Sequence, residues 1–348
     1  MGLSWHDWPS GMVERLRAGL CIPAHPLALR ADRSLDARRQ RALSRYYLAA
    51  GAGGLAVGVH TTQFAIREVG MHAPVLEITA GAARPETLLV AGAVGRTGQA
   101  LREARLARAC GYHAVLLSLA AWKGAGEDEM IAHCQAVAAE MPLFGFYLQP
   151  AVGGVPLTAR FWQRFAAIDN VVAIKIAPFN RYATLDVLRG VLEAGAQDRI
   201  ALYTGNDDHI VADLLTPFTL GHAGQRHTLR ITGGLLGHWS VWTRGAARLL
   251  AQCRNAGAAI PAETLALDAA ITEMNAAIFD VAHDFHGVIA GCHEVLRRQG
   301  LLEGIWCLDA REGLSPGQAE HISAVAGRYP EWTDDGFVQA HLHDWLSD

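Results

Sequence analysis

The alternation of short apolar runs with longer helical patterns is the feature that most constrains how this chain folds. Eight runs rich in apolar and β-branched residues predict strands, and the stretches between them have apolar residues at helical spacing. The predicted strands are residues 20–24, 54–59, 88–93, 114–119, 143–147, 171–176, 200–203 and 228–232. Predicted helices between them include residues 35–50, 98–109, 128–140, 159–167, 182–194 and 210–215. This order is typical of an α/β protein with a parallel sheet.

Eight strands and their helices within about 240 residues favour an eight-stranded (β/α)₈ TIM barrel. A doubly wound open sheet is the alternative, because periodicity alone does not distinguish a closed sheet from an open one. After Trp239 the strand signals stop, and residues 241–300 have a helical pattern, with Pro261 as a helix start and Gly300 as a stop. Two more helices are predicted at 319–327 and 335–345. We therefore expect a barrel at residues 1–240 and a C-terminal helical region at 241–348 that packs on it.

The composition argues against several classes of partner. Thirty basic and 34 acidic residues give a net charge of −4 without a long run of either sign, so neither nucleic acid nor an anionic membrane is expected. The N-terminal residues lack the pattern of a signal peptide, and the apolar runs are too short to span a bilayer. The six cysteines are far apart and form no CxxC pair, which indicates reduced thiols in a cytoplasmic protein.

A lysine in the sixth predicted strand is the first candidate for chemistry. The segment Val171-Val172-Ala173-Ile174-Lys175-Ile176-Ala177 places Lys175 on one face of the strand with only alanines beside it. A buried ammonium is costly unless it is paired or loses its proton, and small neighbours leave room for a ligand at its nitrogen. This pattern is typical of a Schiff-base lysine. A lysine at the edge of the sheet is the alternative interpretation.

The fifth predicted strand offers a second candidate. In Leu143-Phe144-Gly145-Phe146-Tyr147, the bulky Phe144 and Phe146 suit the side facing the helices, so Tyr147 is predicted to point inward beside Lys175. In a barrel both side chains would lie near the C-terminal mouth, where active sites form. A phenol beside an amine could then transfer protons. A core tyrosine whose hydroxyl binds the backbone is the other interpretation.

These residues resemble those of a known family. Tyr147-Leu148-Gln149-Pro150 is similar to the Tyr-x-x-Pro motif of the dihydrodipicolinate synthase/N-acetylneuraminate lyase family, and Lys175 follows Tyr147 at the family's spacing. The turn Gly205-Asn206-Asp207-Asp208 is similar to the family's Gly-x-Asp-Asp turn after the seventh strand. The resemblance implies a (β/α)₈ barrel with C-terminal helices, and a Schiff-base aldolase of 2-oxo acids. Within it, Gly205, Asp207 and Asp208 would receive the polar part of the substrate.

The end of the second predicted strand is the expected site for the carboxylate of a 2-oxo acid. Here Val59-His60-Thr61-Thr62-Gln63 takes the place of the family's Gly-Thr-Thr-Gly-Glu segment. The resemblance assigns Thr61 and Thr62 as carboxylate binders, and a shift of one residue in the alignment would bring in His60. Hydroxyls and amides at the start of a helix suit an anion. An ordinary helix cap by threonine is the alternative.

Three departures from the family pattern argue against a true dihydrodipicolinate synthase. No arginine follows the Tyr-x-x-Pro motif until Arg160, although the synthases carry one shortly after it. The usual Pro-Tyr-Tyr after the fourth strand is replaced by residues 119–123, so the synthases' tyrosine relay between subunits has no counterpart. Finally, Thr232-Gly233-Gly234 replaces the usual end of the eighth strand. The segment after Pro150 is closer to the neuraminate lyase branch.

Two other motifs are weaker. The glycines at 51–54 follow a helix and precede a strand, which is the reverse of a dinucleotide-binding turn. The histidines at 283, 286 and 293, and those at 341 and 343, have spacings that could bind a metal. Both groups lie in the C-terminal helices, away from the predicted mouth, so a solvated or core histidine is the preferred interpretation.

The resulting hypothesis is a lyase or aldolase that cleaves or forms a carbon–carbon bond in pyruvate or a related 2-oxo acid, with an aldehyde as the second partner. A dehydratase of a keto-deoxy sugar acid shares the same first steps, and a non-catalytic metabolite-binding protein is the alternative of another class. No metal or organic cofactor is expected, because the lysine is itself the electrophilic catalyst. The resemblance also implies a homo-oligomer, a dimer or a tetramer.

Overall fold

The computed structural model describes residues 2–257 and 259–347. Its strands are β1 (Cys21–Pro23), β2 (Gly54–Val57), β3 (Leu88–Ala93), β4 (Ala114–Leu117), β5 (Leu143–Leu148), β6 (Val171–Ala177), β7 (Ala201–Thr204), β8 (Phe218–His222), β9 (Gln225–Leu229) and β10 (Gly233–Leu236). Its α-helices are α1 (Met12–Ala18), α2 (Ala37–Ala50), α3 (His72–Ala82), α4 (Thr97–Ala109), α5 (Glu127–Ala138), α6 (Ala159–Ala166), α7 (Arg181–Glu193), α8 (Ile210–Leu215), α9 (Thr243–Arg254), α10 (Ala262–Ile278), α11 (Val288–Arg298), α12 (Gln318–Arg328) and α13 (Asp335–Leu346).

Eight of the strands form one parallel sheet, with the order β1-β10-β7-β6-β5-β4-β3-β2. The two ends of this order also meet. Ala24 and Ala56 form a parallel bridge, and the backbone N–H of His25 donates to the carbonyl of Ala56 at 2.8 Å. A sheet whose first and last strands are neighbours is a barrel, here nearly closed. The predicted (β/α)₈ barrel is therefore confirmed, and the open doubly wound sheet is wrong.

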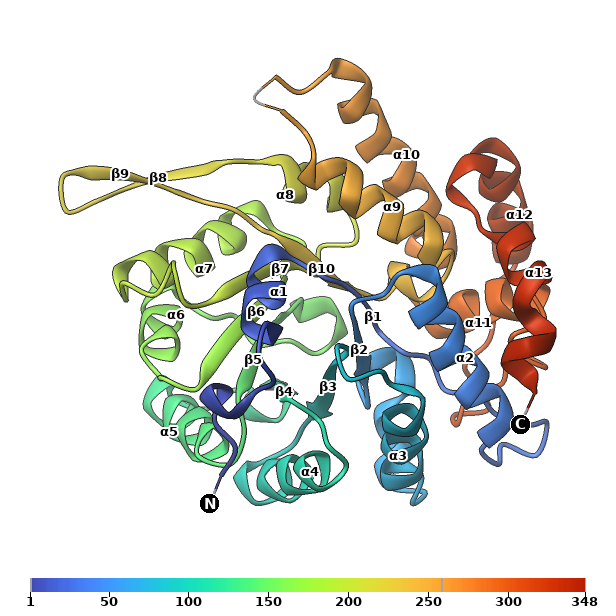
Figure 1. Cartoon of the computed structure of the whole chain (residues 1–348), viewed down its shortest axis with the longest axis horizontal. Coiled ribbons are helices and arrows are strands. Elements are labelled where there is room, and N and C mark those ends of the chain that lie inside the picture. The colour runs from blue at the N-terminus through green and yellow to red at the C-terminus, as the bar shows by residue number, and fades with distance from the viewer. Residues whose placement is uncertain (1, 258, 348) are drawn as a thin grey trace. The chain divides into compact units, whose positions relative to one another are not determined.

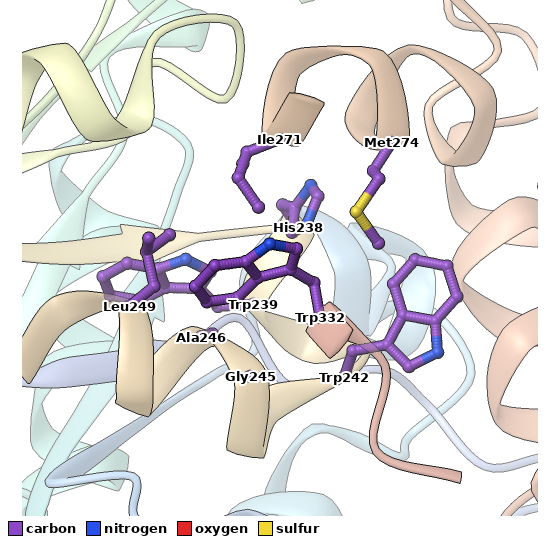
Figure 2. Close-up of a pocket in the computed structure, with 9 residues that line it drawn as sticks. All are labelled: His238, Trp239, Trp242, Gly245, Ala246, Leu249, Ile271, Met274 and Trp332. Atoms are coloured by element: carbon purple, nitrogen blue, oxygen red, sulfur yellow. The ribbon is translucent and has the colours of Figure 1, made fainter. Parts of the chain in front are cut away.

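The chain divides into two compact units. The first comprises the first 20 residues together with residues 88–206 and 212–235, and it holds β3 to β7 and most of β10. Within it α4, α5, α6 and α7 each follow one strand of the series, as the ribbon shows (Figure 1). Helix α6 begins at Thr158, whose hydroxyl accepts the N–H of Phe161. Its aromatic face, Phe161, Trp162 and Phe165, is buried.

The second unit comprises residues 21–87, 207–211 and the chain from 236 onward. Helix α2 begins at the N-cap Asp36 and lies beside α13, where Arg38 and Arg45 donate to the last carbonyls of the helix. Tyr46 of α2 donates to Asp334 at 2.8 Å. The predicted helices of this region are confirmed as α9 to α13, and Pro261 is the N-cap of α10. No helix of the described residues is long and apolar enough to cross a membrane.

The eighth barrel strand is not where the sequence predicted it. Residues 228–232 were expected to form that strand, but Thr228 and Leu229 end β9, the second strand of an antiparallel hairpin with β8. The barrel strand is β10, which begins at Gly233. The β-branched run 228–232 has the stronger strand propensity, whereas two glycines weaken the signal of the true strand. The hairpin, a long ribbon in Figure 1, was not predicted, nor were α1 and α3.

Buried histidines make the stability of the fold depend on pH. Burial lowers the pKa of five described histidines from 6.5 to about 4, namely His25, His72, His133, His238 and His293. Between pH 6.5 and 4 the unfolded chain binds protons that the folded chain does not, so stability is lost as the pH falls through this window. Each histidine contributes up to about 1.4 kcal/mol per pH unit.

We expect the urea concentration at the midpoint of unfolding to be lower at pH 5 than at pH 7. This decrease should be smaller in the variant His72→Gln. His343 is exposed and serves as the control, because His343→Gln removes no buried imidazole. Equal pH dependence in His72→Gln and the wild type would contradict this account.

Candidate functional site

Lys175 lies inside the first unit, on the inward face of β6. The side chain is only 8% exposed, and its ammonium nitrogen lies 4.7 Å from the centroid of the Phe146 ring. The register of the sheet pairs Phe146 with Lys175 and Lys175 with Tyr203, so these three side chains form one layer. Directly paired residues of neighbouring parallel strands point to the same face. The prediction that Lys175 shares an inward face with small residues holds, since Ala173 and Ala177 are two positions away on the same strand.

Gly205 lies directly beside the side chain of Lys175. An added Cβ at this residue would lie 2.6 Å from Cε of Lys175 and 2.7 Å from Cβ of Ala177. The backbone N–H of Gly205 donates to the carbonyl of Ile176 at 2.7 Å, which continues the pairing of β6 with the chain after β7. Any side chain at this position would therefore push against the stem of Lys175. Of the turn Gly205–Asp208 that the sequence analysis identified, Gly205 is the residue that lies against the lysine.

The predicted orientation of Tyr147 is wrong. Tyr147 pairs with Ile176 on the face turned toward the helices, and its ring lies 5.4 Å from that of Trp162 in α6. Its hydroxyl donates to the carbonyl of Leu157 at 3.2 Å and accepts the N–H of Leu157 at 3.1 Å. Phe144 and Phe146, expected on the helix side, face inward instead. The backbone bonds to Leu157 match the core-tyrosine interpretation, and nothing tests a role for Tyr147 in proton transfer.

The reason for the reversal is the close approach of α6 to β5. An added Cβ at Gly145 would lie 2.6 Å from the ring of Phe165, so only a glycine fits on the outer face at this point. A glycine inside a strand often marks such an approach by another element. The aromatic residues of α6 and the glycine at position 145 could thus have indicated the orientation of β5 from the sequence. It shows that Gly145 and Tyr147 face the helix layer.

A buried polar network fixes the loops at the ends of β6 and β7. Asp213 is fully buried and accepts hydrogen bonds from Thr204 at 2.7 Å and from the side-chain amide of Asn206 at 3.0 Å. Arg181 forms an ion pair with the same carboxylate. Asn206 in turn accepts the backbone N–H of Phe179 at 2.9 Å. These bonds satisfy a charge that would otherwise be costly to bury, and they hold the residue next to Gly205 in one position.

Ser118 is an inward-facing hydroxyl that the sequence reasoning missed. Leu116 pairs with the inward Phe144, so alternation along β4 places Ser118 on the same inward face and in the layer of Phe146 and Lys175. Ser118 is 5% exposed, and its oxygen accepts the N–H of Ala120 at 3.3 Å. Ser118 lies inside the predicted strand 114–119 and directly after β4, and its face followed only from the register of β4 with β5.

Thr61 and Thr62 belong to the second unit, in a 3₁₀ turn (His60–Thr62) after β2. Thr61 donates its hydroxyl proton to the carbonyl of Ala24 at 2.7 Å, and Thr62 donates to the carbonyl of His25 at 2.6 Å. The Thr62 oxygen also accepts the N–H of Gly58 at 3.0 Å. Since each hydroxyl has one proton, a carboxylate bound here would depend on backbone N–H groups. The expected role of both threonines stays a prediction.

The acidic residues of the turn also lie in the second unit. Asp207 is 5% exposed and accepts the backbone N–H of His238 at 2.9 Å, while the carbonyl of Asp208 accepts the hydroxyl of Thr272 at 2.9 Å. His60 is half-buried, with its ring 5.9 Å from that of Phe64. Asp207 is thus fixed by the turn after β10. Its predicted contact with substrate is untested.

The histidine groups do not form a metal site in the described residues, where no cluster of three or more His, Cys, Asp or Glu side chains could hold an ion. His283 instead pairs with the buried Asp280 at 2.6 Å. Asp280 also accepts the hydroxyl of Ser315 and the N–H of Gly287. The six cysteines are free thiols, and most are buried.

Comparison with known proteins identifies the family. The model of the dihydrodipicolinate synthetase family matches residues 21–225, which is more than half of the chain. The chain belongs to this family. Among curated proteins, it is 28% identical over 194 residues to the Streptomyces coelicolor protein named Probable 5-dehydro-4-deoxyglucarate dehydratase 2, covering 54% of this chain and 58% of that protein. It is 24% identical over 207 residues to a 4-hydroxy-tetrahydrodipicolinate synthase of Bifidobacterium longum, covering 59% and 65%. The match thus spans less than two thirds of these relatives.

Solved structures of the family share the fold. The protein CdNal from Clostridium difficile, in complex with mannosamine, superposes with a TM-score of 0.73 at 14% identity, over 89% of this chain and 99% of that chain. The dihydrodipicolinate synthase from Acinetobacter baumannii, complexed with pyruvate, gives a TM-score of 0.73 at 17% identity, over 89% and 98%. At such identities the likeness establishes the barrel and no more.

Replacing Tyr147 by phenylalanine tests its outward position. Loss of both hydrogen bonds to Leu157 should lower the free energy of unfolding by about 1–3 kcal/mol, because a buried donor and acceptor lose their partner. The amide of Leu157 should also exchange its hydrogen faster. Tyr182 is 83% exposed, so Tyr182→Phe should leave both measurements unchanged. Wild-type stability and exchange in Tyr147→Phe would contradict the placement.

The contact between Gly205 and Lys175 predicts the effect of a single methyl group. Gly205→Ala should destabilise the protein by about 1–3 kcal/mol, because the new methyl overlaps the lysine stem. Gly81 in α3 has open space around its Cα, so Gly81→Ala should be neutral or stabilising by up to about 1 kcal/mol. If thermal unfolding showed the two variants to be equally stable, the space beside Lys175 would be wider than described.

Proposed function

We propose that the protein is a lyase whose Lys175 forms a Schiff base with pyruvate or a related 2-oxo acid. The observation that carries the proposal is the environment of the amine. Lys175 lies buried against the ring of Phe146, beside a glycine that leaves no room for other side chains. A buried lysine beside an aromatic ring and a glycine is suited to nucleophilic attack on a carbonyl.

The lysine content of the chain supports this interpretation. The chain has 30 basic residues, and only two of them, Lys123 and Lys175, are lysines. Lys123 is exposed. Where a positive charge alone is needed, this sequence uses arginine, as in the pair of Arg181 with the buried Asp213. Arginine does not lose its proton in proteins and cannot form an imine, whereas lysine can do both. The one buried lysine is therefore the position at which amine chemistry has a use.

The reaction begins when the Lys175 amine attacks the ketone carbon of the 2-oxo acid, and loss of water gives an iminium. A base removes the proton of the hydroxyl group two carbons from the iminium carbon, and the iminium accepts the electron pair of the bond between that hydroxyl-bearing carbon and the carbon next to the iminium. That bond then breaks, releasing an aldehyde and leaving an enamine. Protonation of the enamine and hydrolysis of the imine release pyruvate and restore the lysine. Condensation is the same sequence in reverse, and the scheme needs no metal or organic cofactor.

Proton transfer in this scheme needs a group other than Tyr147, whose hydroxyl is committed to Leu157. Ser118 has an inward hydroxyl in the Lys175 layer, and we assign it to this task together with solvent. The family resemblance assigns the substrate carboxylate to the turn of Thr61 and Thr62. It also assigns the hydroxylated tail of the substrate to Asp207 and Asp208.

A dehydratase is the second candidate, supported by the 28% identity to the Streptomyces coelicolor protein whose name describes a 5-dehydro-4-deoxyglucarate dehydratase. The chemistry is shared up to the iminium. In a dehydratase the iminium loses a proton from the neighbouring carbon, and the resulting enamine expels a hydroxyl group as water. Aldehyde plus pyruvate indicates the aldolase, and a deoxygenated keto acid indicates the dehydratase.

Borohydride trapping tests the Schiff base directly. With pyruvate and sodium borohydride, we expect a reduced pyruvate adduct on the peptide that contains Lys175, identified by mass spectrometry. Lys123→Arg is the matched control and should trap normally, because it removes the exposed lysine. Lys175→Arg keeps the charge but should give no adduct, and turnover of any active substrate should fall roughly 10⁴-fold or more.

A wild-type protein that binds pyruvate without forming an adduct would contradict the proposal and favour a non-catalytic metabolite-binding protein. An adduct on Lys123 alone would also contradict it, since that would show ordinary surface reactivity.

A further inference from the structure

A cavity lies in the first unit, at the end of the sheet opposite to the proposed catalytic residues. It has a volume of about 280 Å³ and is lined by the N-terminal end of β7, the end of α1 and the base of the β8–β9 hairpin. Lys175 and Gly205 lie toward the C-terminal ends of β6 and β7, whereas the cavity is lined by Ala201 and Leu202 at the start of β7. The cavity is therefore separate from the proposed reaction site, and its size suits a ligand of a few heavy atoms.

Two arginines give this basal cavity a positive character. Arg17 is half-buried and donates from Nε to the carbonyl of Arg199 at 3.2 Å, and Arg230 donates to the carbonyl of Leu215 at 3.4 Å. Neither forms an ion pair with a carboxylate of the described residues. Asp198 is the acidic residue of the lining, and it is exposed, with its carboxylate 3.5 Å from the amide nitrogen of Gln197. Guanidinium groups without carboxylate partners can bind an external carboxylate through paired hydrogen bonds.

Unpaired polar atoms lie in the same lining. The hydroxyl of Thr232 and the side-chain oxygen of Gln197 are buried and have no hydrogen-bond partner among the described residues. A buried polar atom without a partner costs about 1–3 kcal/mol, so a native protein seldom leaves two such atoms together. The amide oxygen of Gln197 can only accept a hydrogen bond. A ligand that satisfied it would have to offer an O–H or N–H group.

We propose that the basal cavity binds a small hydroxylated carboxylate, with its carboxylate on Arg17 and Arg230 and a hydroxyl on Thr232 and Gln197. The combination of cations and acceptors selects this class, because a bare carboxylate would leave the Gln197 oxygen unsatisfied and a neutral polyol would leave both guanidiniums without a carboxylate partner. The site does not depend on the Schiff-base proposal.

The fold offers a physical route from this site to the lysine. Arg230 follows β9, so a ligand held by this arginine would fix the base of a hairpin that is only two strands wide. Strand β7 runs from the cavity wall at Ala201 to the residue before Gly205. The hydroxyl of Tyr203, the β7 residue paired with Lys175, also donates to Leu16 in α1, one residue before Arg17. Ligand binding would therefore restrain the strand that carries Gly205.

Calorimetric titration with glycerate, which has two hydroxyls and one carboxylate, tests the proposal. We expect one site on the wild-type protein, with affinity weakened about tenfold or more by Arg17→Gln or by Arg230→Gln, since each removes a charge-assisted contact. Arg226→Gln is the matched control, because Arg226 lies in the same hairpin but does not line the cavity. Its affinity should equal that of the wild type.

Titrations with propionate, glycerol and inorganic phosphate test the parts of the proposal separately. Propionate should bind more weakly than glycerate to the wild type, and Thr232→Val should reduce that difference. Glycerol should show no binding. Glycerate affinity that survives both arginine substitutions would overturn the site, as would equal affinity for propionate and glycerate. Tighter binding of inorganic phosphate than of glycerate, weakened by Arg230→Gln, would overturn the assignment to a carboxylate.

Discussion

The in-register pairing of β5, β6 and β7 is the constraint on which the candidate site depends. Once Phe146, Lys175 and Tyr203 share one layer, alternation fixes the face of every other residue on these strands. The same register places Gly205 one step beyond the layer, against the lysine stem. A slip of one residue would move Lys175 to the helix side and expose Ile174 to the barrel interior. The position of the lysine in the barrel is thus a consequence of strand pairing.

That pairing is protected at the ends of the strands by the Asp213 network. A buried carboxylate needs several donors, and here they come from the end of β7, from Asn206 just after it and from the start of α7. Removing one donor would leave a charge without compensation in the interior. The loops after β6 and β7 are therefore held by a polar network on the outer side of the sheet, where Thr204 pairs with Ile176.

Much of this arrangement could be read from the sequence, and the failures have identifiable causes. The strand and helix order, the barrel and the inward Lys175 followed from hydrophobic periodicity. Tyr147 was misplaced because aromatic bulk was taken as the sign of the helix side, while the decisive fact was that Gly145 must face Phe165. The register shift between Leu143 and Phe144, where β6 has an extra residue, also cannot be read from either strand alone. The eighth strand was missed because Gly233 and Gly234 carry no strand signal.

The reversal of β5 changes how the site is understood. With Tyr147 outside, the aromatic face beside the Lys175 nitrogen is that of Phe146, whose ring centroid lies 4.7 Å away. The negative face of an aromatic ring stabilises a cation, and both the ammonium and the iminium of a Schiff base are cations. Phe146 can therefore hold the lysine before and after it reacts, while offering no proton. In the proposed mechanism, charge stabilisation by Phe146 is therefore separate from the proton transfer that was expected of Tyr147 and is now proposed for Ser118.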